Sequence, residues 1–138
     1  MNPSFRGRKL FLDATVLISG TTLVDTASYA LYICGSDLLY SNEYCVMETR
    51  HYFQDKKNCP PHETNGVIDS IRSRVCILPT APVKEYQKLD LPDKLKSDKP
   101  VVKGALDVNA VLVTHDRALL REARKYVETA APAEILKK

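Results

Sequence analysis

Four acidic residues of this chain stand at positions where side chains from distant segments could meet. Asp13 closes the apolar segment "KLFLD", and Asp116 follows the apolar run "AVLV" after Thr114 and His115. Asp98 shortly precedes "PVVKGAL", whose Pro100 suits the first turn of a helix. These acids therefore lie where a strand ends or a helix begins.

Glu48 is the fourth acid, and it lies inside a helical pattern. The segment "SNEYCVMETRHYF" opens with Ser41 or Asn42 as a possible cap, and Glu48 follows almost two turns later. Helical side chains lean toward the N-terminus of their helix, so Glu48 is expected to reach back toward the start of the helix.

The elements that must position these acids alternate between short apolar runs and longer amphipathic segments, which is typical of an α/β fold with a parallel sheet. Strands are predicted over 9–13, 37–41, 74–79, 110–114 and, weakly, 126–129. Helices are predicted over 21–34, 42–55, 64–73, 100–109 and 117–126, with loops at 58–66, where Thr64 could cap the next helix, and at 89–100. We predict a single domain over 1–138, a Rossmann-like three-layer sandwich with a central parallel sheet of four or five strands flanked by helices.

In such a fold the carboxyl ends of the strands and the amino ends of the helices share one edge of the sheet, where ligands bind. Asp13, Glu48, Asp98 and Asp116 are thus expected to converge there. Like charges so close raise one another's pKa values and oppose folding unless a cation neutralises them. Carboxylate oxygens suit Mg²⁺ or Mn²⁺.

Each acid taken alone has a simpler interpretation. Asp98 or Asp116 could be a helix cap, because Asp is a preferred N-cap residue, and a lone Glu48 could face solvent. Asp13 is harder to explain in this way, because a carboxylate at the end of a buried strand needs a partner. The expected convergence of all four favours a metal site.

The order and setting of these acids resemble those of PIN domains. The matching stretches are "LFLDATVLISG", "YSNEYCVMETR", "SDKPVVKGALDVNAVLVTHDRALL" and "APAEIL", which together span about residues 8 to 136. The resemblance implies a metal-dependent nuclease that cuts RNA. Many members of this length are VapC-like toxins held inactive by a small antitoxin, and related toxins are dimeric.

The resemblance also implies roles for particular residues. Asp13, Glu48, Asp98 and Asp116 would be the catalytic, metal-binding acids, and Thr114 would support Asp116. The family commonly has asparagine two residues after the first acid, where this chain has Thr15. A threonine hydroxyl can also hydrogen-bond a carboxylate, although it reaches less far than an amide.

Basic residues are numerous enough to surround an acidic crevice. The chain has 20 Lys and Arg against 17 Asp and Glu, and the surplus of three becomes seven when the four acids are left out. Arg117, Arg121 and Arg124 recur at helical spacing on one face of the segment 117–126. Contact with RNA phosphate and a merely solvated helix face remain equally open interpretations.

The four cysteines, Cys34, Cys45, Cys59 and Cys76, show no CxxC spacing, and three of them lie in apolar segments. Free thiols of this kind fit a reducing, cytoplasmic setting. No run approaches the roughly 18 apolar residues of a membrane span. We therefore expect no membrane association.

The leading hypothesis is an Mg²⁺- or Mn²⁺-dependent endoribonuclease, the toxin of a type II toxin–antitoxin pair, with an RNA substrate, a small antitoxin partner and a homodimeric state. No GxSxG, P-loop or GxGxxG motif indicates acyl transfer or nucleotide-cofactor chemistry. Two alternatives stay open. The chain could be a PIN-like RNA- or protein-binding module that no longer holds metal, or a structural domain in which each acid is a cap.

Overall fold

Five parallel strands form one sheet in the part of the chain that the structure describes. This structure is a computed structural model that describes residues 2–23, 26–33 and 38–137. The strands are β1 (Leu10–Leu12), β2 (Leu39–Asn42), β3 (Cys76–Leu78), β4 (Val111–Val113) and β5 (Thr129–Ala130), and they pair in the order β3-β2-β1-β4-β5. The predicted central parallel sheet is confirmed.

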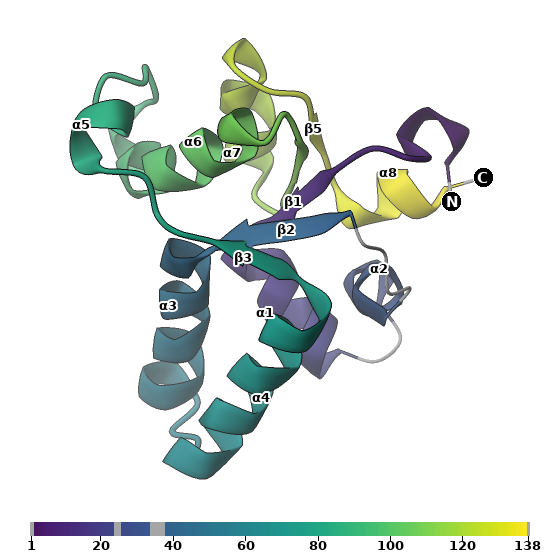
Figure 1. Ribbon diagram of the computed structural model, residues 1–138, viewed down its shortest axis with the longest axis vertical. Coiled ribbons are helices and arrows are strands. Elements are labelled where there is room, and N and C mark those ends of the chain that lie inside the picture. The colour runs from purple at the N-terminus through teal and green to yellow at the C-terminus, as the bar shows by residue number, and fades with distance from the viewer. Residues whose placement is uncertain (1, 24–25, 34–37, 138) are drawn as a thin grey trace.

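Helices cover both faces of this sheet, with α1, α3 and α4 on one face and α6 and α7 on the other (Figure 1). The helices are α1 (Ala14–Thr22), α2 (Ala27–Ile33), α3 (Glu43–His51), α4 (Pro61–Arg74), α5 (Val83–Tyr86), α6 (Lys99–Asp107), α7 (Arg117–Glu122) and α8 (Pro132–Leu136). A π-helix (Tyr52–Lys56) continues α3, and 3₁₀ turns occupy Pro3–Phe5, Asp93–Asp98 and Ala123–Lys125. The three-layer α/β sandwich predicted from the sequence is therefore the observed fold.

The two central strands are buried on both faces, as their continuous apolar sequences predict. Every residue of β1 and of β4 is at most 2% exposed. On one face α6 approaches β1 so closely that a Cβ atom on Gly104 would lie 2.6 Å from the ring of Phe11. A glycine at this position lets the helix lie directly on the strand.

The direction in which strands are added to the sheet reverses between β1 and β4. Strands β2 and β3 lie on one side of β1, and β4 and β5 lie on its other side. Leu12 is paired with Val113 across this junction. In open α/β sheets such a reversal leaves a crevice beyond the carboxyl ends of the two strands, and ligands bind there. Asp13 follows β1 directly, at this crevice.

The helix predicted over 21–34 is wrong in its limits. Helix α1 already begins at Ala14, with Asp13 as its N-cap, and a separate helix α2 starts at Ala27. The sequence of α1 is apolar on most sides because the helix packs against α2, α3 and α4 as well as β1, and this hides its helical periodicity. Residues 24, 25 and 34 of the predicted segment, including Cys34, lie outside the described residues.

The loop predicted over 58–66 is also shorter than expected. Pro60 is the N-cap of α4 and Pro61 its first residue, where proline loses no hydrogen bond. The proposed cap Thr64 instead lies buried inside the helix, and its hydroxyl has no hydrogen-bond partner among the described residues. The prolines thus start the helix and do not exclude it.

Four smaller differences concern the other segments. The predicted loop at 89–100 contains the 3₁₀ turn before α6, and the helix predicted over 117–126 ends as α7 at Glu122 and is followed by another 3₁₀ turn. The weak strand predicted over 126–129 is β5, shifted to Thr129–Ala130. Cys76 is exposed because its strand β3 lies at the edge of the sheet.

No single helix among the described residues is long and apolar enough to cross a bilayer, and only α1 and α2 taken together, as a sharply bent pair, meet the length and composition requirement.

Candidate active site

Asp13 is the residue at which β1 ends and α1 begins. Its side chain is buried, and its Oδ1 accepts a hydrogen bond from the backbone N–H of Val16 at 3.2 Å, as an N-cap does. The hydroxyl of Thr15 donates to Oδ1 at 2.6 Å, and that of Thr114 donates to Oδ2. Three donors from two segments therefore hold this carboxylate in one orientation.

Thr15 stands where asparagine is common in the family that the sequence resembles. Besides donating to Asp13, its hydroxyl accepts a hydrogen bond from the backbone N–H of His115 at 3.1 Å. The hydroxyl therefore connects the first acid to the loop between β4 and α7.

Asp116 is the N-cap of α7. Its Oδ1 accepts from the backbone N–H groups of Ala118 and Leu119 at 2.9 and 3.2 Å, and both bonds end on this one oxygen. The backbone N–H of Asp116 donates to the hydroxyl of Thr114 at 3.1 Å, while the hydroxyl's own proton points to Asp13. Capping therefore occupies one carboxylate oxygen, and a carboxylate has a second one to offer a ligand.

Asp98 immediately precedes α6, but its side chain makes no capping hydrogen bond. The helix-cap interpretation of this residue is therefore wrong. Burial and the charges of Asp13 and Asp116 raise the pKa of Asp98 to about 6. The aspartate thus lies within the electrostatic field of two other acids.

Glu48 on α3 is half-buried, and the charges of Asp98 and Asp13 act on it. Burial, and then the charges of Asp98 and Asp13, raise the pKa of Glu48 to about 7. Burial also raises the pKa of Asp13, although its three hydrogen bonds oppose this increase. The structure therefore brings all four acids into one region, where the charges of Asp13 and Asp116 disfavour that of Asp98 and the charges of Asp13 and Asp98 disfavour that of Glu48.

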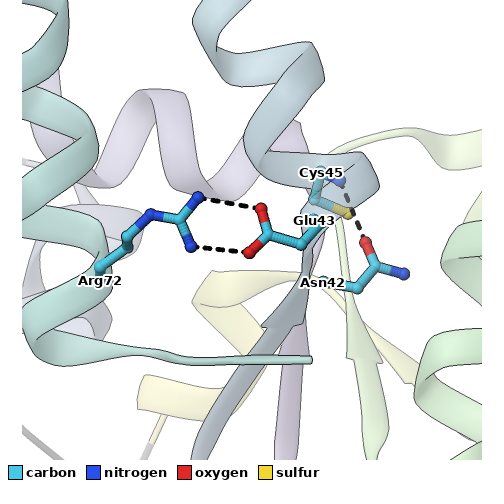
Figure 2. Close-up of polar contacts among 4 residues, drawn as sticks. All are labelled: Asn42, Glu43, Cys45 and Arg72. Atoms are coloured by element: carbon cyan, nitrogen blue, oxygen red, sulfur yellow. Dashed lines mark hydrogen bonds and ion pairs between the residues drawn. The ribbon is translucent and has the colours of Figure 1, made fainter. Parts of the chain in front are cut away.

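Asn42 positions two of these acids at once. Its Oδ1 accepts from the backbone N–H of Cys45 at 3.0 Å and so caps α3 (Figure 2), while its Nδ2 donates to the carbonyl of Pro100 at 3.1 Å. The helix that carries Glu48 is thereby connected to the helix that follows Asp98. Of the two caps considered from the sequence, Asn42 makes this bond.

An ion pair on the surface fixes the same end of α3. Arg72 of α4 donates to both carboxylate oxygens of Glu43, at 2.7 and 2.9 Å (Figure 2). This hydrogen-bonded pair lowers the pKa of Glu43. Glu43 is therefore an ordinary paired acid, unlike Glu48 five residues later.

Tyr44 lies near these acids, and the sequence did not indicate it. Burial and the charges of Glu48 and Asp98 raise the pKa of Tyr44 to about 12, and its hydroxyl hydrogen-bonds the side chain of Ser97. A neutral phenol therefore lies beside two acids. No sequence motif marks it.

His115 is a second residue of this region that the sequence did not indicate. Its Nε2 lies 2.6 Å from the hydroxyl of Ser28 in α2 and 3.1 Å from that of Ser19 in α1. The loop that carries Asp116 is therefore attached to both helices that follow β1.

The three arginines of the segment 117–126 are exposed, whereas Leu119 and Ala123 are fully buried. Arg117 and Arg121 lie on α7, directly after Asp116, and Arg124 donates from Nε to the hydroxyl of Thr129 at 3.1 Å. Positive charge is thus available next to the acidic residues.

The chemistry of this donor set fits a hard divalent cation, since it consists of carboxylates that repel one another. Among the described residues, no three His, Cys, Asp or Glu side chains are arranged as they stand to hold a metal ion. Mg²⁺ commonly binds through only one or two carboxylates, together with water and substrate phosphate. The four acids therefore fit such an ion without a ready-made protein cage.

Solved structures of other proteins share this fold. No protein-family model matches the chain, and no curated protein sequence matches it. A solved structure of PAE2754 from Pyrobaculum aerophilum is 19% identical, with 94% of this chain and 93% of that chain covered and a TM-score of 0.70.

Two further solved structures are complexes. A chain of the DNA-bound VapBC from Salmonella typhimurium is 14% identical over 91% of this chain and 98% of that one, with a TM-score of 0.66. A chain of VapBC2 from Rickettsia felis, bound to a DNA fragment from their promoter, is 14% identical over 88% of this chain and 97% of that one, with a TM-score of 0.64. At these identities the likeness is one of fold, and the PIN-like fold implied by the sequence is confirmed.

Proposed function

We propose that this chain is a metal-dependent endoribonuclease that hydrolyses RNA phosphodiester bonds. The observation that carries the proposal is the set of four acids at the strand-order reversal, where burial and mutual repulsion raise the pKa of Glu48 to about 7 and that of Asp98 to about 6. Acids with strongly perturbed pKa values cluster at functional sites, where burial and like charges are brought together.

Asp13, Glu48, Asp98 and Asp116 would hold Mg²⁺ or Mn²⁺. Such an ion, when bound, offsets charge on the phosphate and lowers the pKa of a bound water. The chain's own contribution is positioning: Thr15 and Thr114 orient Asp13 by hydrogen bonds.

The exposed arginines beside the acids would hold the RNA. Arg117 and Arg121 follow Asp116 on α7, and phosphate contacts from this helix would place the backbone of the RNA over the acids. Without such cations an acidic crevice would repel its substrate.

We further propose that the chain is the toxin of a toxin–antitoxin pair and acts as a homodimer in the cytoplasm. Support comes from the fold, which it shares with chains of two VapBC complexes. The free cysteines among the described residues, Cys45, Cys59 and Cys76, are compatible with a reducing compartment.

The test is cleavage of labelled single-stranded RNA by the purified chain, in Mn²⁺ and in chelator. We expect cleavage only with Mn²⁺, and we expect Asp116→Asn and Asp98→Asn to lower it to the level seen in chelator. Asp69→Asn, a change of an exposed aspartate on α4, is the matched control and should cleave like the parent.

Cleavage that continues in chelator, or at the parental rate in Asp116→Asn, contradicts the proposal. RNA binding without any cleavage in Mn²⁺ would identify the chain as a binding module.

A further inference from the structure

A cleft of about 330 Å³ opens beside the four acids, between α1 and the end of α3. Thr15 and Glu48 line it and belong to the acidic site as well, so the cleft is continuous with that site. Its volume lies at the lower end of the range for small-ligand sites, enough for one planar group. The proposed cleavage chemistry does not use this space.

The far wall of the cleft comes from the π-helix that continues α3. This helix places Tyr52 and Lys56 on the same wall as Glu48, four and eight residues after it, and Ile18 of α1 also lines the cleft. The wider turn is recorded in the hydrogen bond from the backbone N–H of Lys57 to the carbonyl of Tyr52, at 3.1 Å. Short π-helical turns inside or after α-helices are frequently found at functional sites.

The ring of Tyr52 is held in place by its neighbours. The buried Phe53 meets it edge to face, with ring centroids 5.3 Å apart. The ammonium group of Lys57 lies 5.8 Å from the centroid of the Tyr52 ring. An aromatic ring fixed in advance loses little entropy when a flat ligand stacks on it.

We infer that this cleft binds one nucleobase of single-stranded RNA, next to the phosphate that the acids would engage. The inference rests on the proposed function for the identity of the ligand. Unpaired bases of RNA are recognised by stacking on aromatic side chains and by hydrogen bonds to their edges. Tyr52 and Ile18 provide the aromatic and apolar surfaces, and His51, Asp55 and Lys56 provide polar groups for the edge of a base in the same cleft.

Lys56 lines the cleft together with the acids Glu48 and Asp55, and Lys57 follows it in the chain, so two lysines offset the charge of Asp55 at this end of the cleft and can accept an RNA phosphate. A strand that crosses from these lysines to the α7 arginines would pass the acids with its backbone. The base in the cleft would then make the chain prefer certain nucleotides beside the bond that is cut.

The test is an NMR titration in chelator, where no cleavage is possible. A five-nucleotide single-stranded RNA should shift the signals of the Ile18 methyl groups and the Tyr52 ring, because a stacked base carries a ring current. An oligonucleotide that is abasic at its middle position keeps the phosphates and should shift these signals far less. Tyr52→Leu should weaken binding of the RNA about tenfold, within the range expected for one lost stacking contact.

Two matched variants complete the experiment. Tyr52→Phe keeps the ring and should bind RNA like the parent. Tyr29→Leu makes the same change in a tyrosine that lines a different cavity, between α1, α2 and α4, and should also bind like the parent.

The inference is overturned if the RNA leaves the Ile18 and Tyr52 signals unmoved, or if the abasic oligonucleotide moves them equally. A failure of the proposed function gives a different result from a failure of the base site. RNA that shifts these signals but is never cut in Mn²⁺ would refute the proposed nuclease activity and leave the base site standing. Metal-dependent cleavage without these shifts would refute the base site and leave the nuclease activity standing.

Discussion

Removing one acid from the cluster should stabilise the metal-free protein, and Glu48→Gln is the variant that shows it most clearly. In the folded chain the pKa of Glu48 is about 7, compared with an ordinary value of 4.5. A carboxyl group whose pKa rises on folding contributes stability below its unfolded pKa and loses this contribution as the pH rises through the folded pKa. The metal-free parent should therefore lose stability between about pH 4.5 and 7.

The size of the effect follows from the same values. Each pKa unit corresponds to about 1.36 kcal/mol, so full burial would give roughly 3 kcal/mol for Glu48. The side chain is only half-buried, and screening by solvent reduces this to about 1–2 kcal/mol. In a domain of this length, such a difference in the free energy of unfolding shifts Tm by about 3–8 °C.

The assay is thermal melting of the parent and of Glu48→Gln in chelator, at pH 5 and at pH 8. The two proteins should melt at similar temperatures at pH 5, where the carboxyl group of Glu48 is mostly protonated, and the variant should melt higher at pH 8. Glu63→Gln, a change of an exposed glutamate on α4, is the control and should follow the parent at both pH values.

Comparison of the two curves also removes the contribution of Glu43. The pKa of this residue is lowered by Arg72, so its stabilisation has the opposite pH dependence and is lost as the pH falls. It is the same in parent and variant. A Glu48→Gln protein that is less stable than the parent at pH 8 in chelator would refute the electrostatic reasoning and the acid cluster with it.

Three further predictions concern packing, a buried hydroxyl and the basic helix. Gly104→Ala should lower the free energy of unfolding by about 1–3 kcal/mol, because its Cβ would lie 2.6 Å from the Phe11 ring. Gly66→Ala in α4, where nothing lies within 4 Å, should raise it by about 0.5–1 kcal/mol. Thr64→Val should raise it by up to about 1 kcal/mol, since it removes a buried hydroxyl that has no partner among the described residues. Arg121→Ala should weaken RNA binding and reduce its salt dependence, through one lost phosphate contact.

Denaturant unfolding measures the effects of the glycine and Thr64 substitutions on stability. Binding titrations at several salt concentrations measure the effect of Arg121→Ala on RNA binding. Equal effects of the two glycine substitutions would contradict the close approach of α6 to β1. A large loss of stability in Thr64→Val would show that its hydroxyl does have a partner. An unchanged affinity and salt slope in Arg121→Ala would leave the exposed face of α7 as a solvated surface.

Local sequence was enough to predict most of the sheet and the order of the acids along it. The apolar runs that became β1 and β4 have no polar residue, and such runs form strands that are buried on both faces. Asp13 follows such a run directly. Because the carboxyl ends of parallel strands share one edge, the sequence placed Asp13 and Asp116 at the same edge, and the pairing of β1 with β4 in the folded sheet then made them neighbours.

Local sequence was misleading where a residue's neighbours come from several directions. Helix α1 has no clear amphipathic pattern, since it is surrounded by other helices and the sheet, and it was not predicted before residue 21. Pro60 and Pro61 were interpreted as a loop, although proline is equally suited to the start of a helix, and only the packing of α4 decided between the two.

Sequence by itself determined the fold class and placed the four acids at the carboxyl edge of a parallel sheet, because these depend on short-range patterns of apolar and polar residues. Only the tertiary structure decided which groups surround those acids: the threonine hydroxyls on Asp13, the bridge that Asn42 makes between two helices, and Tyr44, whose pKa the charges of Glu48 and Asp98 raise. Hydrogen bonds and charge interactions of this kind act over a few ångströms between residues far apart in the chain. No pattern within one segment records them, since they exist only after the segments have packed together.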